Sequence, residues 1–234
     1  MIDTLLRILT LQNSYSSENT LPMQERGKLI RRVLPNELDR LRPDLIRTLG
    51  PFGSELQIGS SDGIGRKTEA PWVRIYSRTM SPTPREGFYV VIHFAADGSA
   101  IFLTLGCGST IWANGDLRPE TDAELERRTE WARQIVSEAF GSIAPFDSGM
   151  RLGAKAPLPR TFEKATALAY RIPTGDLDEM HIQEILLLLT SRLTAVYQAQ
   201  RIGRNLTGAA AAELLVEQVV TPPVSVKVVA ARLS

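Results

Sequence analysis

Apolar side chains at the i, i+3 and i+4 spacing of a helix open this chain. They recur over residues 2–12 and 24–34. The pattern returns over 38–49, after which Gly50 and Pro51 interrupt it, because glycine and proline both disfavour the helix interior. The first fifth of the chain is therefore predicted to be a block of helices.

Segments rich in Val, Ile, Phe and Tyr come next. They predict β-strands at residues 55–59, 71–77, 88–95 and 100–105. Between the last two, the polar residues 96–99 form a short break of the type that joins antiparallel strands. A small, mainly antiparallel sheet in meander order is expected from this spacing.

Helical patterns return in the second half of the chain. Thr121 and Glu124 form a capping-box signature, and Gly141 stands where a helix that begins there would end. We predict three helices in this half, over residues 121–140, from Thr161 to Tyr170, and from an Asp176 cap to about residue 199.

These elements predict an α+β fold in which the small antiparallel sheet is flanked by N-terminal and C-terminal helices. We assign one domain to residues 1–202, with helices in 2–49, the sheet in 55–105 and helices in 121–199. Residues 203–234 are assigned to a tail, a linker or an accessory element, since Pro222 and Pro223 break any helix there.

Composition narrows the class of protein without naming a partner. The 234 residues are 43% hydrophobic and 23% charged, which is ordinary for a globular protein, and the net charge is only +1. Any nucleic-acid contact must therefore use a local cluster of cations. The single cysteine, Cys107, excludes an internal disulfide and fits a reducing compartment. With no signal peptide and no apolar run long enough to cross a membrane, we expect a cytoplasmic protein with no membrane partner.

The search for catalytic motifs gives mainly negative results. There is no P-loop pattern, and two histidines with one cysteine are too few for a structural zinc site. A dinucleotide-binding turn at Gly59–Gly65 is disfavoured because a strand follows it where a helix is required. Cys107 is expected to be a small buried side chain. We therefore assign no catalytic residue, no metal and no cofactor, and leave a carboxylate-metal nuclease as an alternative.

The most informative stretch runs from Ile58 to Leu105. A glycine-rich loop, Gly59–Gly65, can approach a ligand closely because glycine lacks a Cβ atom. Arg66 and Lys67 follow it at once, and two strands then begin near solitary aromatic residues, Trp72 and Tyr89.

This order of motifs resembles the N-terminal DNA-binding domain of the McrB-type modified-cytosine restriction proteins. The resemblance is specific over roughly residues 55–110 and extends more loosely to about residue 200. Gly63-Ile64-Gly65 is similar to the family's glycine–aromatic–glycine loop, while Trp72 and Tyr89 match its Pro-Trp tryptophan and its strand tyrosine. Ile64 departs from the aromatic loop residue, although an apolar wedge can still enter a base step.

The resemblance implies that the domain recognises methylated cytosine by flipping the base into an aromatic pocket, as part of a restriction system in phage defence. Stacking faces for the base, polar groups for its edge and cations for the flanking phosphates are what such a task requires. The implied base pocket consists of Trp72, Tyr89, Ile64 and His93. Loop contacts are assigned to Ser60, Ser61, Asp62, Gly63 and Gly65. Phosphate contacts are assigned to Arg66, Lys67, Arg74, Arg78 and Arg85.

The implied partner is double-stranded DNA that carries a modified base. Catalysis is then expected in a separate nuclease or nucleotide-driven motor module, so the chain itself is not predicted to be an enzyme. His93 has a simpler interpretation as a packing residue, because a lone imidazole has many structural uses. Two alternatives for the whole chain stay open: an interaction scaffold of a defence system that does not read bases, and a metal-dependent nuclease.

Overall fold

The computed structural model describes residues 1–63 and 65–204. The predictions for Ile64 and for the tail over residues 205–234 lie outside the described residues.

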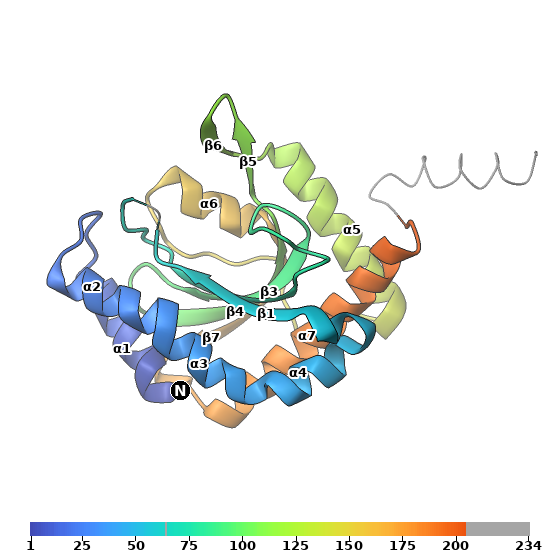
Figure 1. The fold of residues 1–234 in the computed structure, drawn as a ribbon, viewed down its shortest axis with the longest axis horizontal. Helices are drawn as coiled ribbons and strands as arrows, with labels where there is room; N and C mark the ends of the chain where they lie inside the picture. Colours follow the sequence, from blue (N-terminus) through green and yellow to red (C-terminus); the bar gives the residue numbers. More distant parts are fainter. Residues whose placement is uncertain (64, 205–234) are drawn as a thin grey trace, which may run out of the picture.

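A five-stranded antiparallel sheet forms the centre of the molecule, in the order β1-β2-β3-β4-β7 (Figure 1). The first four strands follow one another as a meander, as predicted, and β7 joins at the β4 edge. The α+β class is confirmed. The strands are β1 (Leu56–Ser61), β2 (Trp72–Ser77), β3 (Phe88–Phe94), β4 (Ala100–Cys107) and β7 (Thr166–Pro173).

Strand β7 corrects one prediction. Residues 161–170 were expected to form one helix, but α6 ends at Lys164 and the chain turns into β7 at Thr166. Leu168 and Tyr170 pair with Leu105 and Leu103 of β4 in antiparallel register. Tertiary contacts override the local helical pattern here. The edge of the buried strand β4 needs a hydrogen-bonding partner, and residues 166–173 can supply one because their side chains alternate between the two faces of the sheet.

A second, smaller sheet was not predicted. It is a hairpin of β5 (Thr110–Ala113) and β6 (Asp116–Pro119), which projects from the rest of the fold (Figure 1). Its turn residues Asn114 and Gly115 have φ values of 54° and 77°. Asn-Gly is the pair that two-residue hairpin turns prefer, because both central residues need positive φ.

The predicted N-terminal block of helices is confirmed. Proline stands at the first or second position of three of these helices, where its missing N–H costs nothing. The helices are α1 (Ile2–Gln12), α2 (Leu21–Lys28), α3 (Leu34–Leu38) and α4 (Arg42–Leu49). A π-helical turn at Leu29–Val33 joins α2 to α3, a 3₁₀ turn at Asp39–Leu41 joins α3 to α4, and a 3₁₀ turn at Gly50–Glu55 leads from α4 into β1.

The described part of the chain has three further helices: α5 (Asp122–Phe140), α6 (Pro157–Lys164) and α7 (Glu179–Arg201). The boundaries of α5 are as predicted: Thr121 accepts a hydrogen bond from the Glu124 amide at 3.3 Å, and Gly141 ends the helix with φ 78°. For α7 the predicted cap was wrong. Asp178, which accepts from the His181 amide at 2.8 Å, is the N-cap, while Asp176 lies in a preceding 3₁₀ turn.

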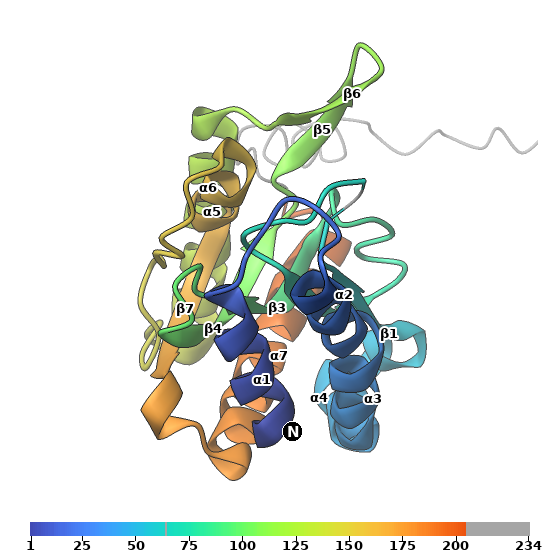
Figure 2. The ribbon, with the colours of Figure 1, turned by 90° about the vertical axis from the view of Figure 1, so that its left-hand side faces the viewer.

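The two faces of the large sheet differ. Helices α1, α3, α4 and α7 lie against one face, where the main core is completely buried, as at Leu5, Ile92 and Leu189 (Figures 1 and 2). Helix α6 lies over the opposite face, together with the loops before β2 and β3 (Figure 1). This second face is covered only in part, and it carries the candidate site.

Candidate functional site

Alternation along the strands sends a set of polar and aromatic side chains to the partly covered face of the sheet. On β2, Trp72 and Arg74 share this face, while on β3 it receives Tyr89, Val91 and His93. The strand register sets Trp72 opposite His93 and Arg74 opposite Val91. Side chains from two neighbouring strands are thereby held together on one face of the sheet.

A cavity of about 670 Å³ lies over this surface. The sheet forms its floor, the glycine-rich loop and the loop before β3 form its sides, and α6 and the β5–β6 hairpin close over it. The volume falls within the usual range for ligand sites. Its lining includes these predicted site residues: Ser61, Gly63, Arg66, Lys67, Trp72, Arg74, Arg85, Tyr89 and His93.

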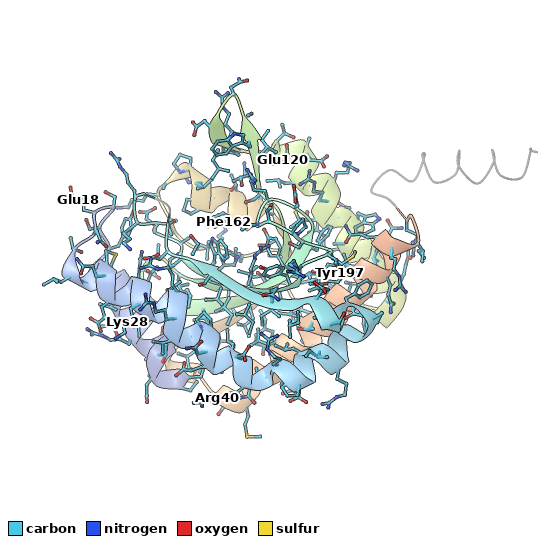
Figure 3. All side chains as sticks on the ribbon, viewed as in Figure 1. Glu18, Lys28, Arg40, Glu120, Phe162 and Tyr197 are labelled. Atoms are coloured by element: carbon cyan, nitrogen blue, oxygen red, sulfur yellow. The ribbon has the colours of Figure 1, made fainter. Side chains whose placement is uncertain are left out.

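His93 lies in the floor of the cavity and is only 6% exposed. Its ring stacks on Phe162 of α6, with centroids 5.8 Å apart and an interplanar angle of 28°. Figure 3 shows Phe162 between α6 and the sheet. Burial lowers the pKa of His93 to about 3, so its imidazole is neutral at physiological pH. No hydrogen-bond partner for its buried Nδ1 lies among the described residues.

Tyr89 is a rigid part of the floor. Its side chain is 9% exposed, and its hydroxyl donates to the Pro84 carbonyl at 2.7 Å, with the Cys107 carbonyl 3.0 Å away. Burial raises the pKa of this hydroxyl well above its usual value. Cys107 is itself buried, as predicted, and burial raises the pKa of its thiol to about 12, which leaves it unreactive.

Arg74 occupies a different place from the one expected of a phosphate contact. Its side chain is 4% exposed and lies inside the cavity lining. The guanidinium carbon lies 3.6 Å from the centroid of the Tyr76 ring and 5.3 Å from that of Tyr89. Its Nη1 donates to Ser81 Oγ at 3.0 Å. Arg74 is therefore a cation of the cavity floor.

The glycine-rich loop is built around Asp62, which is completely buried. Its carboxylate pairs with Arg31 and, at 2.7 Å, with Lys67 Nζ. Two predicted ligand contacts, Asp62 and Lys67, are thus engaged with each other. Gly63 has φ 110°, and its amide donates to Ser61 Oγ at 3.2 Å.

A set of buried polar residues that sequence reasoning missed supports this loop. Arg26 is completely buried and donates to Gln12 Oε1 at 2.6 Å and to the Thr68 carbonyl at 2.7 Å. Burial lowers its pKa to about 10. Gln12 in turn donates to the Glu69 and Ala95 carbonyls. The sequence held one indication of this buried arginine: Arg26 stands at helical spacing between two core residues, where an apolar side chain would be expected.

Glu69 joins the loop to α6. Its Oε2 accepts hydrogen bonds from the amides of Lys155 and Ala156, each at 2.7 Å. Ala156 is the N-cap residue of α6, which carries Phe162 over the cavity. The loop and the helix that covers the cavity are therefore positioned together.

The other predicted cations lie in different settings. Arg66 is exposed beside the cavity, and Arg85 reaches toward the Trp112 ring, at 5.9 Å from its centroid. Arg78 lies outside the cavity lining and pairs with Glu55 at 2.9 Å. Ser60 and Gly65 also lie outside the lining, because Ser60 alternates to the opposite face of β1 and Gly65 is exposed.

Trp112 was also missed by sequence reasoning. It lies on the β5–β6 hairpin, is 64% exposed, and belongs to the cavity lining. A large exposed aromatic side chain on a projecting hairpin is unusual for a purely structural residue. Its Trp-Ala-Asn-Gly context was a hairpin signal in the sequence.

The loop gives a direct stability prediction. In Gly63→Ala, the new Cβ would overlap the carbonyl oxygen of Arg66, and φ 110° is strained for alanine. We expect a loss of at least about 2 kcal/mol of unfolding free energy. Gly65→Ala is the matched control: φ is 74°, no described atom beyond its chain neighbours lies within 4 Å of the new Cβ, and the expected loss is about 1 kcal/mol. Urea unfolding of both variants measures the difference, and equal losses would contradict this account of the loop.

Within the described residues, no three His, Cys, Asp or Glu side chains gather in a way that could hold a metal ion. The same part of the chain contains no helix with the length and hydropathy to span a membrane.

A family model described as the MrcB-like N-terminal domain matches residues 10–190. The chain belongs to this family. The match covers all five strands of the large sheet and the cavity, and it identifies the chain as a DNA-binding module of the McrB type. No curated protein and no solved structure matched the chain.

Proposed function

We propose that this domain is the DNA-binding module of a restriction system. It binds double-stranded DNA and holds one modified base, a methylated cytosine, which is extruded from the duplex into the cavity. The observation that carries the proposal is the cavity itself. Its floor combines aromatic and apolar side chains with a few buried polar groups, which is the lining that a flipped base requires.

The side chains divide into two roles under this proposal. Trp72 offers a ring face for stacking on the base, and Tyr89 with the His93–Phe162 pair limits the depth of the cavity. Arg66 and Arg85 are the predicted phosphate contacts that remain at the mouth, where they attract DNA without reading its sequence.

Trp112 extends the aromatic surface from the hairpin. The open volume supports a reader over the scaffold alternative, because a scaffold that had lost base reading would be free to fill the cavity with side chains. Catalysis is assigned to a separate nuclease or nucleotide-driven motor module.

The test is a binding panel of identical duplexes whose target position holds cytosine, 5-methylcytosine, 5-hydroxymethylcytosine, N4-methylcytosine or, in a matched site, N6-methyladenine. One methyl group in an apolar pocket contributes about 1–3 kcal/mol, so we expect about 10- to 200-fold preference for 5-methylcytosine over cytosine. A fluorescent base analogue beside the target reports extrusion. Equal affinity for every duplex at a fixed salt concentration would remove the proposal.

A further inference from the structure

Arg74 is a buried cation whose charge is not balanced by a carboxylate of the described residues. Its side chain is 4% exposed, it lines the cavity, and it forms no ion pair with any residue that the structure describes. Its guanidinium group instead lies against the rings of Tyr76 and Tyr89 and donates a hydrogen bond to Ser81 Oγ. Buried charges in proteins are normally paired or hydrogen-bonded, because removing a charge from water is costly. The cavity therefore contains a donor group whose natural counterpart is a ligand.

The surroundings of Arg74 fix the orientation of its guanidinium group. The Tyr76 ring, 3.6 Å from the guanidinium carbon, covers one face, and Ser81 Oγ accepts from Nη1 at 3.0 Å. Ser81 is completely buried and itself donates to the Glu86 carbonyl at 2.7 Å. Gly59 lies opposite Arg74 on the neighbouring strand β1. Its backbone comes close to the stacked Arg74 and Tyr76 side chains, because a Cβ atom at this position would lie 3.3 Å from the Tyr76 ring. A planar group with five N–H donors is thus held in place at the cavity floor.

A guanidinium fork recognises two neighbouring acceptor atoms best. Cytosine presents such a pair on its Watson–Crick edge, at N3 and O2. Thymine presents an N3–H donor there, which would point at the donors of the arginine. His93, a neutral imidazole on the same face of the sheet one strand away, can accept a hydrogen bond from the amino group at C4.

We propose that Arg74 reads the extruded base by donating to N3 and O2 of a cytosine ring, and is therefore a specificity-determining residue. This inference rests on the proposed function, since it requires a base in the cavity. A substituent at C5 lies away from N3 and O2, so Arg74 selects the ring while other walls respond to the methyl group. The site accordingly accepts 5-methylcytosine and rejects thymine, which carries the same methyl group.

The experiment removes the acceptor from the DNA and the donor from the protein. The target base is 5-methylcytosine or its 3-deaza analogue, placed opposite an abasic site so that loss of base pairing does not enter. For the full chain we expect the 3-deaza duplex to bind about ten- to a hundredfold more weakly, as for one bidentate contact. For the Arg74→Met variant, replacing 5-methylcytosine by its 3-deaza analogue should alter the affinity less than threefold. Arg66→Ala, an exposed cation beside the cavity, should weaken both duplexes alike and keep the full 3-deaza effect.

The outcomes separate this inference from the proposed function. If the full chain prefers 5-methylcytosine over cytosine but binds the 3-deaza duplex equally well, Arg74 does not read N3 and only this inference fails. If all duplexes bind equally, the proposed function fails. A uniform loss in Arg74→Met together with a flatter salt dependence would make Arg74 a phosphate contact instead. A thermal melt shows whether Arg74→Met folds, and the two duplexes with the unmodified protein decide the question without that variant.

Discussion

Tyr89→Ala is expected to lose about 3–5 kcal/mol of unfolding free energy and, with it, binding to every duplex, as for other buried aromatic residues. Its ring fills the floor of the cavity and its hydroxyl is fixed by the Pro84 carbonyl at 2.7 Å. Trp72→Ala should behave differently, because Trp72 is only partly buried at the start of β2. We expect it to fold and to lose about 1–3 kcal/mol of binding to the preferred modified duplex, with non-specific binding almost intact.

Thermal unfolding and binding measured on the same samples distinguish the two residues. Tyr89→Phe is the control that keeps the ring and removes the hydroxyl; it should cost about 1 kcal/mol of stability and retain selectivity. A Trp72→Ala protein that folds normally, keeps full selectivity and still extrudes the base would show that Trp72 is not a wall of the binding site.

Asp62→Ala is expected to reduce the unfolding free energy by about 3 kcal/mol, because breaking a buried ion pair leaves charge without its partner. Asp62 is completely buried, and its partner Lys67 is 11% exposed in the side chain. The Arg31 side chain is 47% exposed, so its charge can be solvated when Asp62 is removed, and this limits the loss of unfolding free energy. The change should also disorder the glycine-rich loop beside the cavity and weaken DNA binding. Chemical denaturation and binding of the same variant provide the measurements.

Glu25→Ala is the matched control for Asp62→Ala. Glu25 also pairs with an arginine, Arg7, but both side chains are more than 40% exposed, so the expected loss of unfolding free energy is much smaller than for Asp62→Ala. Both variants remove one carboxylate, and only the environment differs. If Asp62→Ala were as stable as Glu25→Ala, the loop would not depend on its buried ion pairs.

Part of the candidate site could be predicted from the sequence. Trp72, Tyr89 and His93 line the cavity. The family resemblance indicated Trp72 and Tyr89, and period-two alternation placed His93 on the same face of its strand as Tyr89. Their roles toward a base stay predictions. The cations were harder to place, because composition does not reveal whether an arginine faces water. Arg74 lies in the cavity floor, while Arg78 pairs with Glu55 at the other end of β2.

Elements whose signals are local could be predicted from the sequence alone. Strands β2, β3 and β4, and the ends of α5 at Thr121 and Gly141, depend on residues a few positions apart, so periodicity and capping were sufficient to find them. Features that depend on residues far apart in the sequence were set by tertiary contacts. Strand β7 forms because β4 needs a neighbour, and Phe162 joins the site because Glu69 holds the start of α6 beside the loop. Arg74 became a buried cation through packing against Tyr76 and Ser81, since burial is a property of the surrounding structure and not of the residue.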